Sequence, residues 1–278
     1  MNFPLHLEET PDEHGIYLMV RKDSPPFNHM VHPQTLGEFK SEYLGWENIH
    51  SPTLAEWLST PSQIFRTITS GAVHYDAVGE LSEFRTQLAW YPHDIWLYLL
   101  AAGWHRIGES EHLMPRAGYI GDELGSALIG SQLVSDIMLL CFLMEKKYAP
   151  YAKWFGSAFL QLECADEILP FLQRTISTGS WEKREVELAA AYRLLAGMHN
   201  NLGITKPLPE QVSSFHGRPF QVIHGDHFGD AILGEIKDHQ VQKIASITLS
   251  GGIDQISDNT KFSTEKKTRK IIKRLYEI

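Results

Sequence analysis

Residues 92–107 read PHDIWLYLLAAGWHRI, and this stretch decides the fold class of the chain. Its apolar positions recur at intervals of three and four residues, which is the period of a packed α-helix. Pro92 stands where a first helical residue belongs, because its missing N–H is not needed there. The stretch therefore predicts a core helix. Its expected buried face consists of Ile95, Trp96, Leu99, Leu100, Gly103, Trp104 and Ile107.

A second long helix is predicted over residues 122–145, and the two helices form the expected spine of the fold. The inward positions of this second helix are Leu124, Leu128, Val134, Met138, Cys141 and Phe142. Further helices follow from apolar periodicity and from start and stop signals, such as Gly203 as a helix stop. They cover residues 151–162, 166–176, 181–202, 226–236 and 264–276. The fold class expected is mainly α, a multi-helix domain with a short irregular or β N-terminal segment.

The N-terminal residues 1–34 differ from the rest, since they are rich in Pro, His and acidic side chains. Two short apolar stretches, residues 16–20 and 29–31, are candidates for a pair of strands. Helix signals begin at Thr35, which has a glutamate three residues later, as in a capping box. We therefore expect residues 1–34 to be an N-terminal remnant or extension and residues 35–278 to be a helical domain.

The composition is that of an ordinary globular protein, with 43% hydrophobic and 21% charged residues among 278. Two cysteines are too few for a disulfide framework, and Cys141 lies in an apolar run where a free thiol behaves as a small hydrophobe. The sequence has no uninterrupted apolar stretch of ~18 residues and no basic, apolar leader at its start. We therefore expect a cytoplasmic protein with no membrane partner.

The charge of the chain argues against nucleic acid as a partner. A formal net charge of −9 repels phosphate backbones. The densest basic run, residues 266–274, has the pattern of a solvated face on a terminal amphipathic helix. No nucleic-acid partner is expected.

One pattern imitates the way in which nucleotidyltransferases hold a triphosphate and its metal. Gly125 and Ser126 are followed by Gly130 and then by Asp136. Two-metal transfer needs clustered carboxylates at the end of a strand, whereas the second acidic position here is Met138, inside a helical period. The pattern therefore indicates small residues at a helix-packing face.

A second pattern, His224-Gly225-Asp226 followed by Asp254, is similar to segments of aminoglycoside-type phosphotransferases. There the first Asp acts as a base toward a hydroxyl and the later Asp holds Mg²⁺. The expected Asn is absent, and no glycine-rich loop with a strand lysine precedes the motif. We favour a helix N-terminus with Asp226 as its cap and His224 in the preceding turn.

The spacings of Glu47 with His50 and of Glu109 with His112 are those of di-iron bundles. Both pairs lie at predicted helix ends or loops, whereas bundle metals are held from facing mid-helix positions. No cysteine pair or zinc-protease pattern occurs. No metal and no cofactor are therefore expected.

Glu145 is a carboxylate on the apolar face of the second long helix, so it must be paired, hydrogen-bonded or protonated. Lys153 or Arg116 could supply the partner charge, and Tyr148 and Tyr151 could donate hydrogen bonds. A buried ion pair between two helices and a ligand pocket are equally compatible with this pattern.

Several of these stretches together resemble the domain-of-unknown-function family DUF4037. The resemblance covers roughly residues 29–278. It is carried by residues 90–100, 121–126, 141–145, 148–156, 199–200, 218–220 and 252–255.

The resemblance implies that, in that family, this region follows an N-terminal nucleotidyltransferase-like domain. That domain carries a Gly-Ser motif and paired acidic residues. Residues 1–34 are similar at most to the closing strands of such a domain, so its nucleotidyl chemistry is assigned to no residue here. The resemblance implies that this chain corresponds to the helical half of such proteins. In related enzymes that half packs against the catalytic domain and helps to shape the acceptor pocket.

The positions that match the polar motif of the family are the candidate site residues. The catalytic candidates are Glu145, as a general base, with Tyr148, Tyr151, Lys153 and His199. The ligand-binding candidates are Arg116, Asp122, Glu123, Trp154, Asn200, Arg218 and Asp254.

The first functional hypothesis is a helical small-molecule-binding domain of a nucleotidyltransferase-like family, without transfer activity by itself. Its partners would be a small polar molecule and either a separate catalytic domain or a second copy of the chain. The alternative is a free-standing enzyme of small-molecule metabolism that uses acid–base residues in the helical pocket. A third hypothesis is a phosphotransferase-like enzyme. Whether the chain is catalytic stays open at this point.

Overall fold

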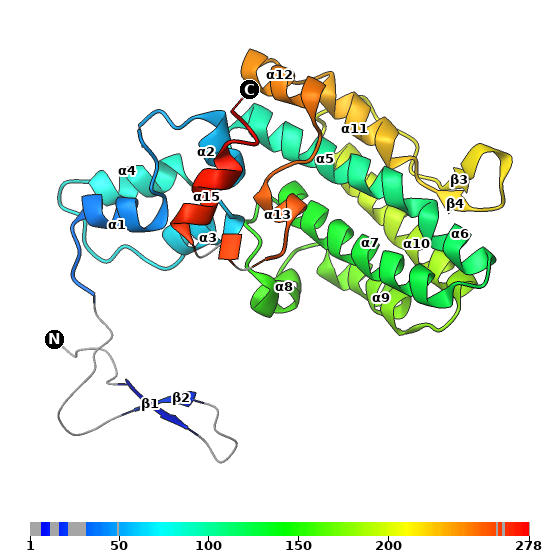
Figure 1. Cartoon of the computed structure of the whole chain (residues 1–278), viewed down its shortest axis with the longest axis horizontal. Helices are drawn as coiled ribbons and strands as arrows, with labels where there is room; N and C mark the ends of the chain where they lie inside the picture. Colours follow the sequence, from blue (N-terminus) through cyan, green and yellow to red (C-terminus); the bar gives the residue numbers. More distant parts are fainter. Residues whose placement is uncertain are drawn as a thin grey trace. The chain divides into compact units, whose positions relative to one another are not determined.

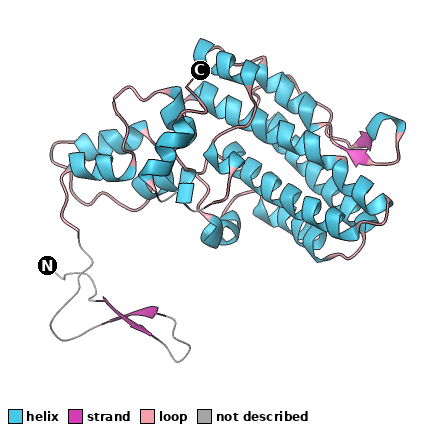
Figure 2. Cartoon of the chain, viewed as in Figure 1, coloured by secondary structure: helices cyan, strands magenta, loops and turns pink. Residues whose placement is uncertain are grey.

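The computed structural model describes residues 7–11, 17–21, 32–48, 50–259, 261–262 and 265–277 (Figure 1). Helices dominate these residues, and the strands form two small two-stranded sheets (Figure 2). The mainly α prediction is confirmed. By its contacts the chain divides into two compact units, residues 1–42 and 43–278.

The first unit contains an antiparallel pair of strands, β1 (Leu7–Pro11) and β2 (Tyr17–Arg21). Strand β2 agrees within one residue with the strand predicted at 16–20, but its partner is β1. The other predicted strand, residues 29–31, lies outside the described residues. Helix α1 (Leu36–Tyr43) begins with the predicted capping box, in which the Thr35 N–H donates to Glu38 and the Glu38 N–H donates to Thr35. The predicted domain boundary after residue 34 stays a prediction.

The spine of the second unit is α5 (His93–Glu111), which packs against α7 (Glu123–Met144) and α11 (Gly225–Leu233). Every residue from 95 to 104 is buried, although the sequence predicted only one buried face. The reason is that α5 also contacts α2, α6 and α12, so neighbours cover it on all sides. A helix in this position needs to be apolar all round.

The other elements of the second unit surround this spine (Figure 1). Helices α9 and α10 pack against each other and against α7. The helices are α2 (Leu54–Ser59), α3 (Ser62–Thr69), α4 (Glu80–Gln87), α6 (Leu113–Tyr119), α8 (Ala152–Phe159), α9 (Ala165–Ser177), α10 (Trp181–Asn201), α12 (His239–Ile247), α13 (Ile253–Ile256) and α15 (Lys266–Lys273). A small hairpin consists of β3 (Ser213–Ser214) and β4 (Gln221–Val222). Every predicted helix has a counterpart in the structure, whereas α4, α6, α12 and α13 were not predicted.

The inward face predicted for α7 is wrong in its first half. Leu124 and Leu128 are 73% and 64% exposed, while Val134, Cys141 and Phe142 are buried as expected. Ser126 and Gly130 face inward instead, where Ser126 accepts a hydrogen bond from the Arg184 guanidinium at 2.8 Å. The small residues that imitate a nucleotidyltransferase motif thus pack against α10, as predicted.

Helix α7 is also long and apolar enough to cross a membrane, with a mean hydropathy of 1.9. Half of the apolar window is buried against other helices of the unit. Packing against these helices accounts for the buried half of its apolar residues.

The basic helix α15 is less solvated than its sequence predicts. Arg269 is buried and donates to the Tyr43 carbonyl at 2.8 Å. Lys273 lies 3.5 Å from the buried Glu56 carboxylate. These contacts follow from the packing of α15 against α2, which turns part of the basic face inward.

Candidate functional site

The structure does not bring the sequence candidates together in one pocket. Three of them, Asp122, Glu123 and Glu145, are helix caps. The others divide among a loop after α10, a shallow groove, the exposed face of α8, and the surroundings of α3 and α13.

Glu145 is the C-cap of α7, and its carboxylate oxygens accept the backbone N–H groups of Glu163 and Cys164 at 2.9 and 2.8 Å. Those donors open α9, where a negative charge is favourable. The predicted partners, Lys153 or Arg116 and the two tyrosines, are therefore wrong. The physical reason is that the helical period stops at Glu145, because the chain turns away with Lys146 at φ 53°.

Asp122 and Glu123 likewise stabilise helix starts. Asp122 is the N-cap of α7 and accepts the Gly125 N–H at 2.7 Å. Glu123 accepts the Trp181 N–H at 3.0 Å and lies 3.4 Å from the Arg184 guanidinium. These contacts occupy both carboxylates within the fold.

His199 is buried against the rings of Trp104 and Phe228. Its Nε2 lies 2.9 Å from the Thr205 hydroxyl, and burial lowers its pKa to about 4. Asn200 beside it bonds both backbone groups of Leu208 at 2.9 Å. The pair holds the loop after α10.

Two candidate arginines do share a surface groove. Arg116 of α6 and Arg218 of the β3–β4 hairpin line an open groove of about 660 Å³ with Tyr119 and Phe220. Lys153 and Trp154 lie elsewhere, on the exposed face of α8, with the ammonium 5.1 Å from the ring centroid. The groove is wide and shallow, so it would contact a ligand on one side only.

Tyr148, Tyr151 and Asp254 all lie beside α3. The Ser62 N–H donates to Asp254 Oδ2 at 2.7 Å, and the Ser62 hydroxyl donates to the Ala149 carbonyl at 2.8 Å. Gln63 Oε1 accepts the Tyr151 N–H at 3.0 Å. Helix α3 thus fixes both α13 and the loop between α7 and α8.

An aromatic cluster supports this junction from inside. The Tyr148 ring stacks on the Phe65 ring, with centroids 5.1 Å apart. Its centroid lies 4.8 Å from that of Trp90 and 5.1 Å from that of Tyr91. The Tyr148 hydroxyl donates to the Leu88 carbonyl at 3.0 Å, and burial raises its pKa. Tyr148 is therefore a neutral structural phenol, which leaves Tyr151 and Asp254 facing the pocket.

The pocket outside the cluster has a volume of about 200 Å³, and we call it the Asp254 pocket. Burial raises the pKa of Asp254, and the hydrogen bonds from Ser62 only partly oppose this. Aromatic and polar side chains surround the carboxylate, and no Lys, Arg or His occurs among the described residues that line it. Its lining includes Ser62, Gln63, Tyr151, Phe155, Asp254, Asp258, Asn259 and Phe262.

Residues 57–155 match the family model described as Domain of unknown function (DUF4037). This part of the chain is a DUF4037 domain. It includes α3, α5, α7 and the loop at Tyr148, so it supplies most of the Asp254 pocket, while Asp254 itself lies beyond the match. A search of curated proteins and a search of solved structures each found no match.

The phosphotransferase-like motif lies away from this pocket. His224, at φ 59°, is the N-cap of α11, so Asp226 is not the cap and the prediction is wrong in that detail. Asp226 packs against Gly108 of α5, whereas Asp254 accepts the Ser62 N–H of α3 and lines a pocket that Asp226 does not line. The structure therefore does not place Asp226 and Asp254 side by side.

The two pairs with di-iron spacing lie at helix ends or loops, as predicted. Glu47 is exposed and lies 3.4 Å from Lys273, and His50 is exposed in the same connection between α1 and α2. Glu109 is exposed in the last turn of α5, and His112 is the C-cap. Neither pair faces a second helix as a bundle site requires.

Sequence reasoning missed Ser62, Gln63, Asp258 and Asn259 of the pocket. The available signals were the helix start after Pro61 and the polar turn at residues 257–259. These signals locate chain turns, but they do not tell which turns meet in space.

Proposed function

We propose that the chain is a helical binding domain for a small, positively charged organic molecule, such as an amine, in the Asp254 pocket. The observation that carries the proposal is a carboxylate with a raised pKa in a pocket that has no basic side chain among its described lining. A cation is the ligand that such a carboxylate lacks.

The aromatic part of the lining supports the same class of ligand. Tyr151, Phe155 and Phe262 offer ring faces, and cations bind favourably over such faces. Asp258 at the exposed rim adds a second negative charge, which attracts cations and repels anions. The volume of about 200 Å³ lies below the range of about 300 to 1,000 Å³ of drug-sized ligand sites, so the ligand is small.

Asp254 also has a structural role, since it caps α3 through Ser62. The two roles make different predictions for Asp254→Asn. Asn keeps an oxygen acceptor for the Ser62 N–H and removes a buried charge, so a binding site loses its ligand with little change in stability. If Asp254 serves only as the cap of α3, no ligand binds in the pocket, and the substitution changes no binding.

The proposal includes the relationship to nucleotidyltransferase-like proteins, with any chemistry supplied by a separate catalytic domain or by a second copy. The chemistry is given to another domain or copy because, in this chain, the Gly-Ser pattern of α7 is used in packing and Glu145 is used as a helix cap. A cytoplasmic location belongs to the same proposal and is supported by the two free cysteines.

Thermal denaturation with choline, putrescine and agmatine tests the proposal, with alcohols and carboxylates of similar size as controls. A ligand at 100 times its Kd stabilises the folded chain by about 2.7 kcal/mol. We expect stabilisation by at least one amine and none by the controls. Asp254→Asn should abolish it, while Asp166→Asn, at an exposed position of α9, should not. Equal responses of both variants contradict the proposal.

A further inference from the structure

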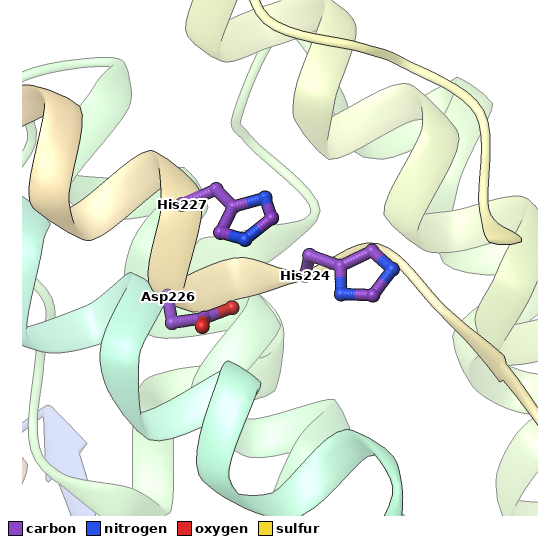
Figure 3. A group of neighbouring side chains, drawn as sticks. All are labelled: His224, Asp226 and His227. Atoms are coloured by element: carbon purple, nitrogen blue, oxygen red, sulfur yellow. The ribbon is translucent and has the colours of Figure 1, made fainter. Parts of the chain in front are cut away.

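A second site lies at the start of α11, where His224, Asp226 and His227 are grouped (Figure 3). One ligand atom from each side chain lies within 4.8 Å of the others. His224 is half-buried, and the other two side chains are exposed. We call residues 223–227 the His224 loop.

The backbone of this loop is held in one conformation by α5. A Cβ atom at Gly225 would lie 2.6 Å from the Trp104 carbonyl oxygen and 2.8 Å from the Gly108 nitrogen. Gly108 is equally close to the loop, since its Cβ would lie 2.6 Å from the Asp226 nitrogen. Only glycines allow this contact, so the helix crossing fixes the position from which the three side chains extend.

Glu111, in the last turn of α5, also holds the loop. Its buried carboxylate accepts the Ile223 N–H at 2.6 Å and the Gly225 N–H at 3.1 Å, on both sides of His224. His224 itself adopts φ 59°, a left-handed conformation that a residue with a Cβ adopts only when its surroundings require it. Strained residues of this kind cluster at functional sites.

The side chains of the loop are left with few structural contacts. Within the described part of the chain, neither the Asp226 carboxylate nor the His227 ring forms a hydrogen bond or an ion pair with another side chain. His224 differs, because its Nε2 lies 2.8 Å from the Ser213 hydroxyl. The His224 and His227 rings are nearly parallel, with centroids 5.2 Å apart.

We propose that His224, Asp226 and His227 bind a divalent metal ion of the zinc class. Two imidazoles and one carboxylate suit Zn²⁺, Ni²⁺ or Co²⁺, whereas Mg²⁺ and Ca²⁺ prefer all-oxygen sites. In the tautomer with the proton on Nε2, that nitrogen donates to the Ser213 hydroxyl, which leaves Nδ1 free to bind the metal and orients the ring, as outer partners of metal-bound histidines do. Three protein ligands leave one position of a tetrahedral ion open to water or to a further ligand.

Titration of the untagged chain with Zn²⁺ tests this proposal, followed by calorimetry and by the loss of free indicator. We expect Zn²⁺ to bind and Mg²⁺ not to compete with it. Co²⁺ used as a probe should give the visible absorption of a four-coordinate nitrogen and oxygen site.

His227→Ala should lower Zn²⁺ affinity by at least about 100-fold, because loss of an outer partner alone costs about 10- to 100-fold. The matched control is His239→Ala, which removes an exposed histidine from the first turn of α12. It should leave the affinity and the Co²⁺ spectrum unchanged. Circular dichroism without metal shows that both variants fold.

Asp226→Asn supplies a second variant, since its exposed side chain has no folding contact to lose. It should weaken binding and change the Co²⁺ spectrum. Unchanged Zn²⁺ affinity in both His227→Ala and Asp226→Asn would overturn the proposal, and so would an equal loss in His239→Ala.

Discussion

The Asp254 pocket and the His224 loop are built in opposite ways. The pocket surrounds a carboxylate whose pKa is raised by burial, and it draws its walls from several elements. The loop exposes two of its three side chains and is instead rigid in its backbone, against Gly108 and Glu111 of α5. The pocket favours a small molecule that supplies the positive charge absent from its described lining. The loop favours a metal ion, which needs side chains held in fixed positions. The two regions should therefore respond to different ligands and different substitutions.

The largest expected effect comes from Gly225→Ala, which forces a Cβ against the α5 backbone. Overpacking costs typically about 1 to 3 kcal/mol, and backbone atoms yield less than side chains, so we expect a loss of about 3 kcal/mol in unfolding free energy. Gly179→Ala is the matched control, because nothing lies within 4 Å of its Cβ position. Urea denaturation measures both. Equal stability of the two variants would show that the α5 crossing does not fix the loop.

The next effect is a pH dependence centred on His199, which packs under α11. Its pKa is lowered to about 4 by burial, whereas an unfolded histidine has a pKa of about 6.5. The unfolded state therefore takes up the proton first, and stability falls as the pH falls from about 6.5 to about 4. The difference of roughly 2.5 pKa units corresponds to about 3 kcal/mol.

His199→Gln should lose most of this slope in denaturation curves measured between pH 7 and pH 4. His74→Gln, at an exposed loop position, should keep it. An unchanged slope in His199→Gln would mean that other groups account for the acid sensitivity.

Ser213→Ala sharpens the comparison, because Ser213 contacts His224 but lies outside the Asp254 pocket. Zn²⁺ affinity should fall by about 10- to 100-fold, since the ring loses its orienting partner. Stabilisation by amines should be unchanged. Ser214→Ala, its exposed neighbour in the hairpin, is the control.

The smallest effect is expected for Tyr151→Ala in the Asp254 pocket. Tyr151 is 38% exposed, and a cation over the ring of an exposed aromatic residue gains about 0.5 to 1 kcal/mol. Amine affinity should fall by a few-fold in calorimetry, and Zn²⁺ affinity should stay the same. A larger loss for Zn²⁺ than for amines would reverse the assignment of the two regions.

The helices themselves were predictable, because periodicity is a local property of the sequence. Residues 92–107 and 122–145 correspond to α5 and α7 within a few residues. The predicted face of α7 failed at Leu124 and Leu128, since hydrophobicity alone does not reveal that small residues pack on a neighbouring arginine.

The candidate site was only partly predictable. Tyr148, Tyr151 and Asp254 were named from the sequence and do lie beside α3, where Tyr151 and Asp254 line the pocket. Glu145 and Glu123 were misread, because a carboxylate that caps a helix distant in sequence looks the same as one that binds a ligand. His224 and Asp226 were noted as a pair, but His227 gained its meaning only from the turn of α11 that brings the three together.

The most direct test of the account is one set of thermal denaturation curves for Asp254→Asn and His227→Ala, each with Zn²⁺ and with the amine panel of choline, putrescine and agmatine. The account predicts that Asp254→Asn loses stabilisation by amines and keeps that by Zn²⁺, while His227→Ala shows the reverse. Loss of both responses in either variant, or of neither response in Asp254→Asn, would contradict it.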